Sequence, residues 1–469
     1  MADTKFDLIV IGGGPAGYVA AIRAAQLGMT VACVDKRETL GGTCLNVGCI
    51  PSKALLNASE KYAEAASGHL AGLGIGVGKV KLDLAEMMAG KDKIVSGLTG
   101  GIDHLFKKNK ITRLTGTACL KGEGKVEVSS KNMTETYTAE RILIATGSVP
   151  TSLPNVEIDE KKIVSSTGAL ALDKLPKSMV VIGAGYIGLE MGTVWSRLGT
   201  KVEVVEFLPR ILPGMDSEVA KKFKAMMTKQ GLSFHLNTAV KSAQSTGSGV
   251  KLVLADAKTG EETEMSCDIA LVSVGRKPNT DGLGLEDLGV EMTDRGQIKV
   301  DADFETNIDG IFAVGDVIPG PMLAHKAEED AVAAVEIMAG QAGHVDYDLV
   351  PGIVYTAPEI ATLGVTEDAL KEAGVDYKKG IFPFLANSRA KATGHTDGFV
   401  KLLADAKTDQ VLGCHIIAHE AGTLIHEVAT AMAFGASSED IARTCHGHPT
   451  MNEAVKEAAL AVDGRAIHI

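Results

Sequence analysis

Cysteine is scarce in this sequence, with seven residues among 469. No CxxC…CxxC or HExxH pattern occurs, so the sequence predicts no metal site. Two of the cysteines lie five positions apart and are treated below. We interpret the other five, which lie far apart along the chain, as reduced core thiols of a protein from a reducing compartment. They are Cys33, Cys119, Cys267, Cys414 and Cys445.

Basic residues are outnumbered by acidic ones. The 47 Lys and Arg residues against 59 Asp and Glu residues leave a formal net charge of -12. A negative chain repels the phosphates of nucleic acids, which argues against non-specific binding to DNA or RNA. The charge is compatible with plain solubility and also with docking of a basic partner.

Long apolar runs are absent as well. No run approaches the ~20 residues that span a bilayer, so we expect no membrane association. Residues 1–5 show no signal-peptide core and no Arg/Ser-rich transit segment. We therefore expect a bacterial cytoplasmic protein, with a processed mitochondrial matrix protein as the alternative. The composition, 45% hydrophobic and 23% charged, is that of a globular protein, and the length predicts two to four domains.

A glycine-rich motif stands near the N-terminus. An apolar strand over residues 6–11 leads into GGGPAG, and a helical pattern follows. Gly12 and Gly14 allow a tight turn and close approach of the backbone to a pyrophosphate, and Gly17 lets the helix pack near the strand. The next strand ends at Asp35, which is placed to accept hydrogen bonds from a ribose.

The same order of elements recurs at residues 178–206. The second motif, GAGYIG, contains Gly183, Gly185 and Gly188, and the strand that follows ends at Glu206. In both copies the acid follows the last glycine by 18 residues (35 − 17 and 206 − 188). Two complete copies predict two dinucleotide sites. A carboxylate binds a free 2′-hydroxyl and repels a 2′-phosphate, so Glu206 favours NAD over NADP.

The two close cysteines are Cys44 and Cys49, in GGTCLNVGCIPSK. Along a regular helix they would be ~7.5 Å apart, whereas a disulfide needs Cα atoms within about 6.8 Å. A disulfide therefore requires a bent segment, for which Gly48 supplies the freedom, with Pro51 opening the next helix. Such a bridge near a helix N-terminus would be easily reduced. Two unrelated core thiols and a metal half-site are the alternatives.

The stretch GGTCLNVGCIPSKALL resembles the flavin disulfide reductases, most closely their dihydrolipoyl-oxidising members, and the resemblance covers essentially the whole chain. Its further anchors are ATGS at residues 145–148, VGRKPN at 274–279, IFAVGD at 311–316 and HPTMNE at 448–453. It implies an α/β fold with two Rossmann-like dinucleotide-binding domains, for FAD and NAD, and a C-terminal α+β dimerisation domain. The implied parts are an FAD-binding domain (1–148), an NAD-binding domain (149–276), a central segment completing the FAD domain (277–346) and an interface domain (347–469).

The same resemblance implies the cofactor contacts. Those expected for FAD are Gly12, Gly14, Gly17, Asp35, Gly42, Thr43, Cys44, Lys53, Gly116, Thr146, Gly147, Ser148, Asp316, Met322, Leu323, Ala324 and His325. Those expected for NAD are Gly183, Gly185, Gly188, Glu206, Val240 and Gly275. Glu190 is expected to pair with Lys53 near flavin N5, although either residue could be an ordinary surface charge. Tyr186 is either a gate of the nicotinamide pocket or a packed aromatic residue.

The resemblance also assigns catalytic roles. Cys44 would exchange with the substrate, and Cys49 would lie against the flavin as the charge-transfer thiolate. His448 would be the acid/base toward the substrate thiol, with Glu453 holding its other ring nitrogen. The structural alternative for Glu453 is a capping box with Thr450. The role of the nearby histidine two positions before His448 stays open.

The implied reaction is oxidation of protein-bound dihydrolipoyl groups to lipoyl groups with NAD as acceptor. It would take place in 2-oxo acid dehydrogenase complexes or in glycine cleavage. The implied partners are a second copy of the chain, lipoyl domains and a basic subunit-binding domain. One alternative is a glutathione-type reductase, which should carry basic residues where Glu206 stands. Another is a non-catalytic flavoprotein subunit, which would not need the intact cysteine pair.

Overall fold

The computed structural model describes residues 5–131 and 133–469. They form two compact units. Unit 1 consists of the described residues up to Leu55, Asp83–Thr151 and Gly275–Tyr347. Unit 2 consists of Leu56–Leu82, Ser152–Val274 and Asp348–Ile469. The prediction that residues 1–5 carry no signal or transit segment concerns mainly residues 1–4, which lie outside the described residues. The division into four parts by cofactor stays a prediction.

Unit 1 is built on a seven-stranded sheet in the order β3-β2-β1-β6-β5-β4, with β17 also paired to β6. The pairs around β1 and β6 are parallel, except that β5 runs antiparallel to β4 and β6. β1 is buried along most of its length, as is usual for a parallel strand covered on both faces. The strands are β1 Lys5–Ile11, β2 Val31–Asp35, β3 Thr112–Thr115, β4 Thr117–Gly122, β5 Lys125–Ser129, β6 Thr134–Ile144 and β17 Ile311–Ala313.

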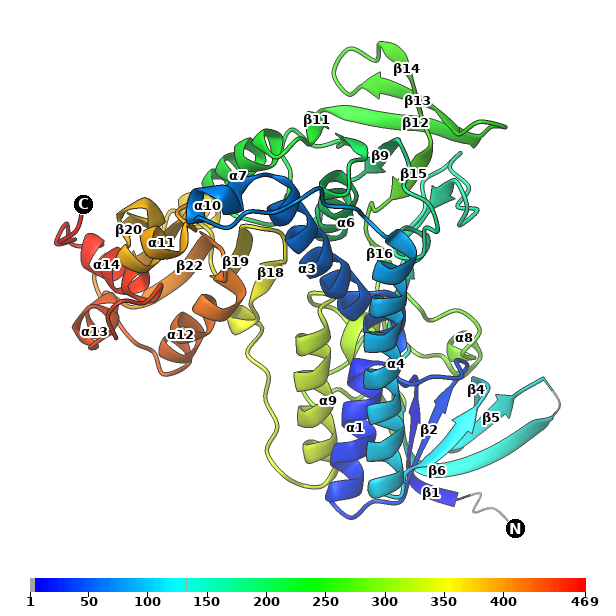
Figure 1. The fold of residues 1–469 in the computed structure, drawn as a ribbon. Coiled ribbons are helices and arrows are strands. Elements are labelled where there is room, and N and C mark those ends of the chain that lie inside the picture. The colour runs from blue at the N-terminus through cyan, green and yellow to red at the C-terminus, as the bar shows by residue number, and fades with distance from the viewer. Residues whose placement is uncertain (1–4, 132) are drawn as a thin grey trace. The chain divides into compact units, whose positions relative to one another are not determined.

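Helices pack on this sheet, and α1 lies between α4 and α9 (Figure 1). Alanines on one side of α1 are fully buried, which lets the helix lie close to its neighbours. The helices of the unit are α1 Pro15–Gln26, α2 Gly42–Val47, the start of α3 Cys49–Ala66, α4 Leu84–Lys108, α8 Leu285–Leu288 and α9 Ala324–Met338. A two-stranded ribbon, β7 Ser148–Pro150 with β16 Arg276–Pro278, adjoins them.

Unit 2 contains a five-stranded parallel sheet, β11-β10-β9-β15-β8, and a three-stranded antiparallel sheet, β12-β13-β14. Their strands are β8 Ile163–Val164, β9 Ser178–Ile182, β10 Lys201–Val205, β11 Ser233–His235, β12 Thr238–Ser245, β13 Val250–Asp256, β14 Glu262–Cys267 and β15 Ile269–Val272. The helices here are α5 Ser166–Ala169, α6 Tyr186–Arg197 and α7 Ser217–Lys229. Both βαβ units predicted from the glycine motifs are therefore present, β1-α1-β2 and β9-α6-β10.

The last part of unit 2 is an antiparallel sheet in the order β18-β19-β22-β21-β20, with helices around it. This confirms the predicted α+β character of the C-terminal part. The strands are β18 Gly352–Val354, β19 Glu359–Gly364, β20 Tyr377–Pro383, β21 Phe399–Asp405 and β22 Val411–Ala418. The helices are α10 Glu367–Ala373, α11 Ser388–Thr393, α12 Ala421–Ala433, α13 Ser438–Arg443 and α14 Glu453–Ala461.

A buried lysine ties two parts of unit 2 together. The side chain of Lys401, on β21, is 0% exposed, and its Nζ lies 3.0 Å from Asp216 Oδ2 and 2.5 Å from Glu367 Oε2. Asp216 also caps α7 by accepting hydrogen bonds from two of its first N–H groups. A buried charge is tolerated only when it is paired and hydrogen-bonded, so these carboxylates fix where β21 meets α7.

The interpretation of the scattered cysteines as core thiols is only partly right. Cys33, Cys267 and Cys414 are buried, and burial raises the pKa of each thiol. Cys119 is half-buried, and Cys445 is exposed. Cys445 follows the end of α13, in a loop between the polar residues Thr444 and His446.

No helix among residues 5–131 and 133–469 is long and apolar enough to cross a membrane.

Candidate functional site

The two glycine-rich turns have the geometry that their motifs predict. Gly12 has φ +105°, and a Cβ there would lie 2.3 Å from Ala145 O. A Cβ on Gly17 would lie 1.7 Å from Gly12 O, so α1 can cross the strand only with glycine at this position. Gly183 and Gly188 repeat both restrictions, with backbone oxygens at 2.6 and 2.3 Å from the added Cβ.

The N-termini of α1 and α6 are open toward a ligand. Neither helix has a side-chain cap on its first N–H groups. A Cβ on Gly185 would meet no atom within 4 Å, and one on Gly14 would meet only Gly42 Cα at 3.7 Å. Uncapped N–H groups beside open space are what a pyrophosphate needs at a helix N-terminus. The residues present therefore fit two dinucleotides.

Each of the two acids predicted to bind ribose accepts a hydrogen bond from the glycine-rich turn of its own βαβ unit. Asp35 Oδ2 accepts a hydrogen bond of 2.7 Å from Gly13 N, and Glu206 Oε2 accepts one of 2.7 Å from Ala184 N. The second oxygen of each carboxylate accepts from the backbone N–H two residues further on, at 2.7 and 2.9 Å. The carboxylates are thus held at the carboxyl ends of β2 and β10, where dinucleotides bind in such sheets.

The cysteine pair lies at a break between two helices. α2 ends before Gly48, whose φ −143° and ψ −113° are not helical, and α3 begins at Cys49. The bend predicted between the cysteines is therefore confirmed. The prediction that Pro51 opens the helix is wrong, because it is the third residue of α3. Proline is tolerated there because the first N–H groups of a helix have no partner within it.

The structure holds the pair as two half-buried thiols in hydrogen-bond contact. The hydrogen bond of Cys44 with Cys49, and then burial, raise the pKa of the Cys44 thiol. Sulfurs in contact within unit 1 are positioned to open and close a disulfide without large movement of the backbone. Among the described residues no group of three or more His, Cys, Asp or Glu side chains could hold a metal ion.

An arginine that sequence reasoning missed joins two predicted flavin contacts. Arg276 Nε donates to Ser148 Oγ at 2.7 Å, and the same hydroxyl donates to Asp316 Oδ2. Arg276 Nη2 also donates to Ser148 O at 2.7 Å. Burial lowers the pKa of Arg276, although Asp316 opposes this. Arg276 belongs to the motif VGRKPN, but only the glycine of that motif was predicted to contact a cofactor.

Near this arginine, the segments that contain Thr146 and Asn279 are joined by hydrogen bonds. Thr146 Oγ1 donates to Asn279 O at 2.7 Å, and Asn279 Nδ2 donates to Thr146 O at 3.2 Å. Gly147 and Gly275 have φ +70° and +122°. The chain therefore leaves and re-enters unit 1 through two adjacent segments that end at the β7–β16 ribbon.

The segment from Met322 to His325 contains the start of α9. These residues are half-buried, and Leu323 precedes the helix without a side-chain cap. The positive end of a 15-residue helix is therefore available to an acceptor such as a flavin carbonyl. These residues, with Gly42 and Thr43 in the first turn of α2, stay predicted FAD contacts.

Other predicted contacts have packing roles that the structure makes clear. Gly116 is required because a Cβ would lie 2.7 Å from Ser129 O, and its N–H donates to Asp35 O at 3.0 Å. Val240 is half-buried and packs against the core of β9, β13 and β15. Both stay predictions as cofactor contacts.

Residues expected near the nicotinamide lie at the start of α6. Glu190 is buried, and its Oε1 accepts a hydrogen bond of 3.1 Å from Tyr355 N. Tyr186 is half-buried, and burial raises the pKa of its hydroxyl. Because Lys53 belongs to unit 1 and Glu190 to unit 2, the pairing of the two stays a prediction.

The C-terminal histidine has the partner that the motif predicts. His448 Nδ1 lies 2.9 Å from Glu453 Oε1, and the side chain of His448 is 68% exposed. Burial opposes ionisation of Glu453, but the Thr450 N–H and His448 outweigh it and lower the pKa of this carboxyl. His448 is thus an exposed imidazole with one nitrogen fixed by a carboxylate, the arrangement of a general base.

The capping box, the alternative role for Glu453, is only half formed. Thr450 N donates to Glu453 Oε2 at 2.8 Å, but Thr450 Oγ1 donates to Gly447 O instead of capping a helix. α14 begins at Glu453 itself, so Thr450 lies too far from the helix to be its N-cap. The carboxylate of Glu453 is therefore shared between the loop and His448.

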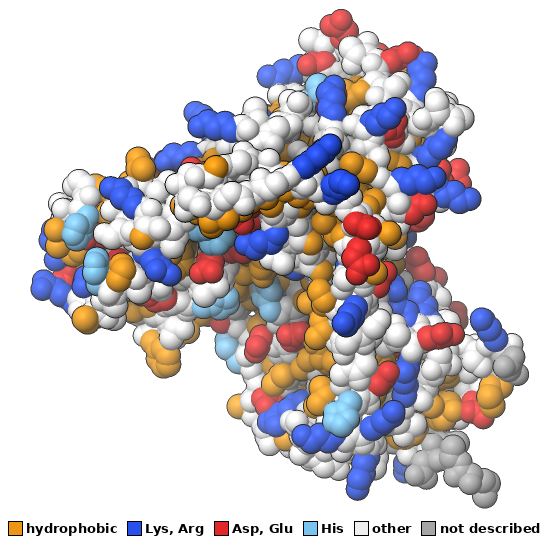
Figure 2. Space-filling view, viewed as in Figure 1, with side chains coloured by type: hydrophobic (Ala, Val, Ile, Leu, Met, Phe, Trp, Pro, Cys, Tyr) orange, Lys and Arg blue, Asp and Glu red, His pale blue; other side chains and the backbone are white. Residues whose placement is uncertain are grey.

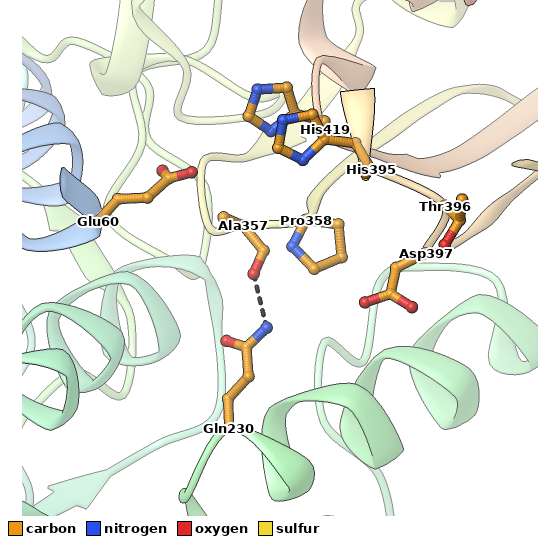
Figure 3. A pocket seen from close by; sticks show the side chains of 9 residues that line it. Glu60, Gln230, Ala357, Pro358, His395, Thr396, Asp397 and His419 are labelled. Atoms are coloured by element: carbon orange, nitrogen blue, oxygen red, sulfur yellow. Dashed lines mark hydrogen bonds between the residues drawn. The ribbon is translucent and has the colours of Figure 1, made fainter. Parts of the chain in front are cut away.

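A surface pocket of unit 2 contains none of the predicted site residues. The rings of His395 and His419 are stacked with centroids 3.7 Å apart, and Gln230 Nε2 donates to Ala357 O at 2.7 Å (Figure 3). Burial, and then His419, lower the pKa of His395. Glu60 faces this pocket from α3.

Glu359, at the start of β19, is a half-buried acid that gives unit 2 a pH dependence. Burial raises its pKa to about 7, and the neighbouring Glu420 and Glu60 add to this, while a hydrogen bond from Gly422 N opposes it. The folded state therefore binds this proton more tightly than the unfolded state, whose pKa is 4.5. Its contribution to stability is full below pH 4.5 and is lost as the pH rises through 7.

We expect Glu359→Gln to remove this loss. Between pH 5 and pH 8 the unfolding free energy of the original protein should fall relative to the variant by on the order of 1–2 kcal/mol, after discounting for partial solvent exposure. Urea unfolding of the holoenzyme at the two pH values measures the difference. Glu372→Gln, on the exposed side of α10, is the matched control, and parallel pH profiles for all three proteins would contradict the expectation.

Comparison with known proteins matches most of the chain. Residues 6–331 match the model of the family described as pyridine nucleotide-disulphide oxidoreductase, and residues 350–459 match its dimerisation domain. The mitochondrial dihydrolipoyl dehydrogenase of Pisum sativum is 56% identical over 464 residues, covering 99% of this chain and 92% of the relative. A protein named leghemoglobin reductase, from Vigna unguiculata, is 58% identical over 456 residues, covering 97% and 87%.

A bacterial relative and a solved structure agree with these matches. Dihydrolipoyl dehydrogenase 3 of Pseudomonas putida is 53% identical over 466 residues, covering 99% of this chain and all of the relative. The crystal structure of LpdA from Mycobacterium tuberculosis superposes with a TM-score of 0.89 at 27% identity, covering 97% of this chain and 99% of that one.

Proposed function

The chain belongs to the pyridine nucleotide-disulphide oxidoreductase family, and from this we propose that it is a dihydrolipoyl dehydrogenase. FAD and NAD are its cofactors. It oxidises protein-bound dihydrolipoyl groups to lipoyl groups through the pair Cys44 and Cys49. The observation that carries the proposal is the contact of these two thiols at the break between α2 and α3, in a chain with two open dinucleotide turns.

The chemistry at the cysteine pair is a thiol–disulfide exchange. His448 takes the proton of one substrate thiol, and the resulting thiolate attacks Cys44 Sγ, which breaks the Cys44–Cys49 bond and leaves Cys49 as a thiolate. The second substrate thiol then attacks the substrate sulfur bound to Cys44, and its proton passes to Cys44 as the bond between the two sulfurs breaks. This closes the substrate disulfide and releases Cys44, so one electron pair has moved to the cysteines. Bound FAD supplies the route by which this pair reaches NAD.

The other residues bind and orient. Glu453 keeps one ring nitrogen of His448 occupied, so that the other faces the substrate. Asp316, which accepts from Ser148, itself bound by Arg276, is positioned to bind the ribityl chain of FAD. Glu206 selects NAD, because its carboxylate would repel a 2′-phosphate.

We propose a homodimer, since residues 350–459 match a dimerisation domain. His448 would then act on the cysteine pair of the other subunit. Lipoyl domains and a basic subunit-binding domain are the proposed partners. Figure 2 shows basic and acidic side chains interspersed over the face drawn, so the excess negative charge is not gathered into one patch there. We place the protein in the bacterial cytoplasm, with the mitochondrial matrix as the alternative, because its relatives include both kinds.

Steady-state assays on the purified holoenzyme test this proposal. NADH formation from dihydrolipoamide and NAD is followed, with NADP in place of NAD and glutathione in place of dihydrolipoamide in parallel reactions. We expect fast turnover with dihydrolipoamide and NAD alone. Preference for NADP and glutathione would move the chain to the glutathione-type reductases, and no turnover with any dithiol would support a non-catalytic subunit.

A further inference from the structure

One carboxylate on α12 contacts the loop that carries His448 on both sides of it. Glu427 Oε1 lies 2.5 Å from Nε2 of His446, two residues before His448. Glu427 Oε2 accepts a hydrogen bond of 2.6 Å from Nδ2 of Asn452, four residues after it. The loop is therefore joined to α12 at two points by a single side chain, and His448 lies between them.

The contact with His446 is a short hydrogen bond. His446 Nδ1 lies 2.9 Å from Thr444 O, and a carbonyl can only accept, so this nitrogen donates. Nε2 of His446 and Oε1 of Glu427 share one proton in the short contact between them. The side chain of His446 is only 5% exposed, so water competes little for this hydrogen bond.

His448 depends on this loop because it has little support of its own. Its side chain is 68% exposed, and Glu453 is its hydrogen-bond partner. Elsewhere on the loop, Asn387 Nδ2 donates to Thr450 O at 3.0 Å. The loop around His448 is thus held by Glu427 on both sides, and by Asn387 and Glu453 at the backbone of Thr450. It is also held by Lys456 Nζ, which donates to Thr444 O at 3.1 Å.

We infer that Glu427 is a positioning residue for His448, which acts by fixing the loop from Thr444 to Asn452. The inference rests on the proposed function for its kinetic consequence and on the structure alone for its effect on the loop. Glu427 is not expected to touch the substrate. A displacement of a catalytic group by about 1 Å can lower a rate about 100-fold, so a loosened loop has a large kinetic effect.

Glu427→Ala tests the inference on the holoenzyme. We expect kcat/KM for dihydrolipoamide to fall roughly 10- to 100-fold, while NADH-driven reduction of an artificial electron acceptor, which does not need His448, stays unchanged. Glu427→Gln should lose less, because its amide oxygen still accepts from His446 and its N–H groups can pair with a turned Asn452 amide. Glu420→Gln, an exposed acid that directly precedes α12, is the matched control.

Two further measurements separate positioning from a general structural defect. In a His448→Gln background, Glu427→Ala should change kcat/KM less than about 2-fold, because a residue that acts through His448 has nothing left to position. Hydrogen–deuterium exchange in Glu427→Ala should rise in the peptide covering residues 444–452 and not in the rest of unit 2.

The outcomes are distinguishable. Equal losses with and without His448 would overturn the inference, as would exchange that is unchanged in the loop or raised throughout unit 2. If the original protein fails to oxidise dihydrolipoamide, the proposed function falls, and the exchange measurement still decides whether Glu427 fixes the loop.

Discussion

Replacing either Cys44 or Cys49 with serine should abolish the oxidation of dihydrolipoamide. A hydroxyl cannot form the mixed disulfide or take part in the bridge, so each single substitution removes the whole route for the electron pair. We expect kcat to fall at least about 10³-fold in both variants. NADH formation with dihydrolipoamide and NAD is the measurement.

The two variants should keep the reactions that do not need the cysteine sulfurs. NADH-driven reduction of an artificial acceptor should persist, because the dinucleotide turns lie outside the cysteine pair. Cys119→Ser, at a half-buried thiol on β4, is the matched control and should retain full activity. Dithiol activity that survives in Cys44→Ser would exclude the exchange mechanism.

His448→Gln should have the second-largest effect. The variant keeps a hydrogen-bonding side chain beside Glu453 but cannot take the proton of the substrate thiol, and general acid–base catalysis contributes about 10²–10⁴-fold. We expect a loss of that size in kcat/KM at neutral pH. The loss should shrink as the pH approaches the pKa of the substrate thiol, where the thiolate forms without a base.

The effect of Glu453→Gln should be compared with that of His448→Gln, to test whether the imidazole is the base. It removes the charge that orients His448 but leaves the imidazole in place, so its loss should be about 10–100-fold, the worth of a charge-assisted hydrogen bond. A variant at Glu453 that loses more than the one at His448 would show that the carboxylate, rather than the imidazole, carries the chemistry.

The sequence predicts best what short-range geometry dictates. Gly17 and Gly188 are forced by close contacts with Gly12 O and Gly183 O inside the same βαβ unit, and the spacing of each motif already contains that information. The bend at Gly48 was also predictable, because a disulfide limits how far apart two Cα atoms can be.

The two side chains that the sequence did not predict, Glu427 and Arg276, make contacts between distant elements. Glu427 meets His446 and Asn452 only because α12 and the loop before α14 pack together, and no motif includes it. Arg276 reaches Ser148 across 128 positions of sequence. Local patterns also misplaced boundaries, as at Pro51, where the first helical turn has no internal hydrogen bonds that could exclude proline.

The buried Lys401 has a consequence for how unit 2 comes apart. Its ammonium group on β21 is enclosed by Asp216 at the head of α7 and by Glu367 at the start of α10. Separating the C-terminal sheet from the parallel sheet of unit 2 would leave Lys401 with Glu367 on one fragment and the carboxylate of Asp216 without its cation on the other, in surfaces shaped to exclude water. The two sheets should therefore melt together in a single cooperative step, and neither should be recoverable as a stable proteolytic fragment.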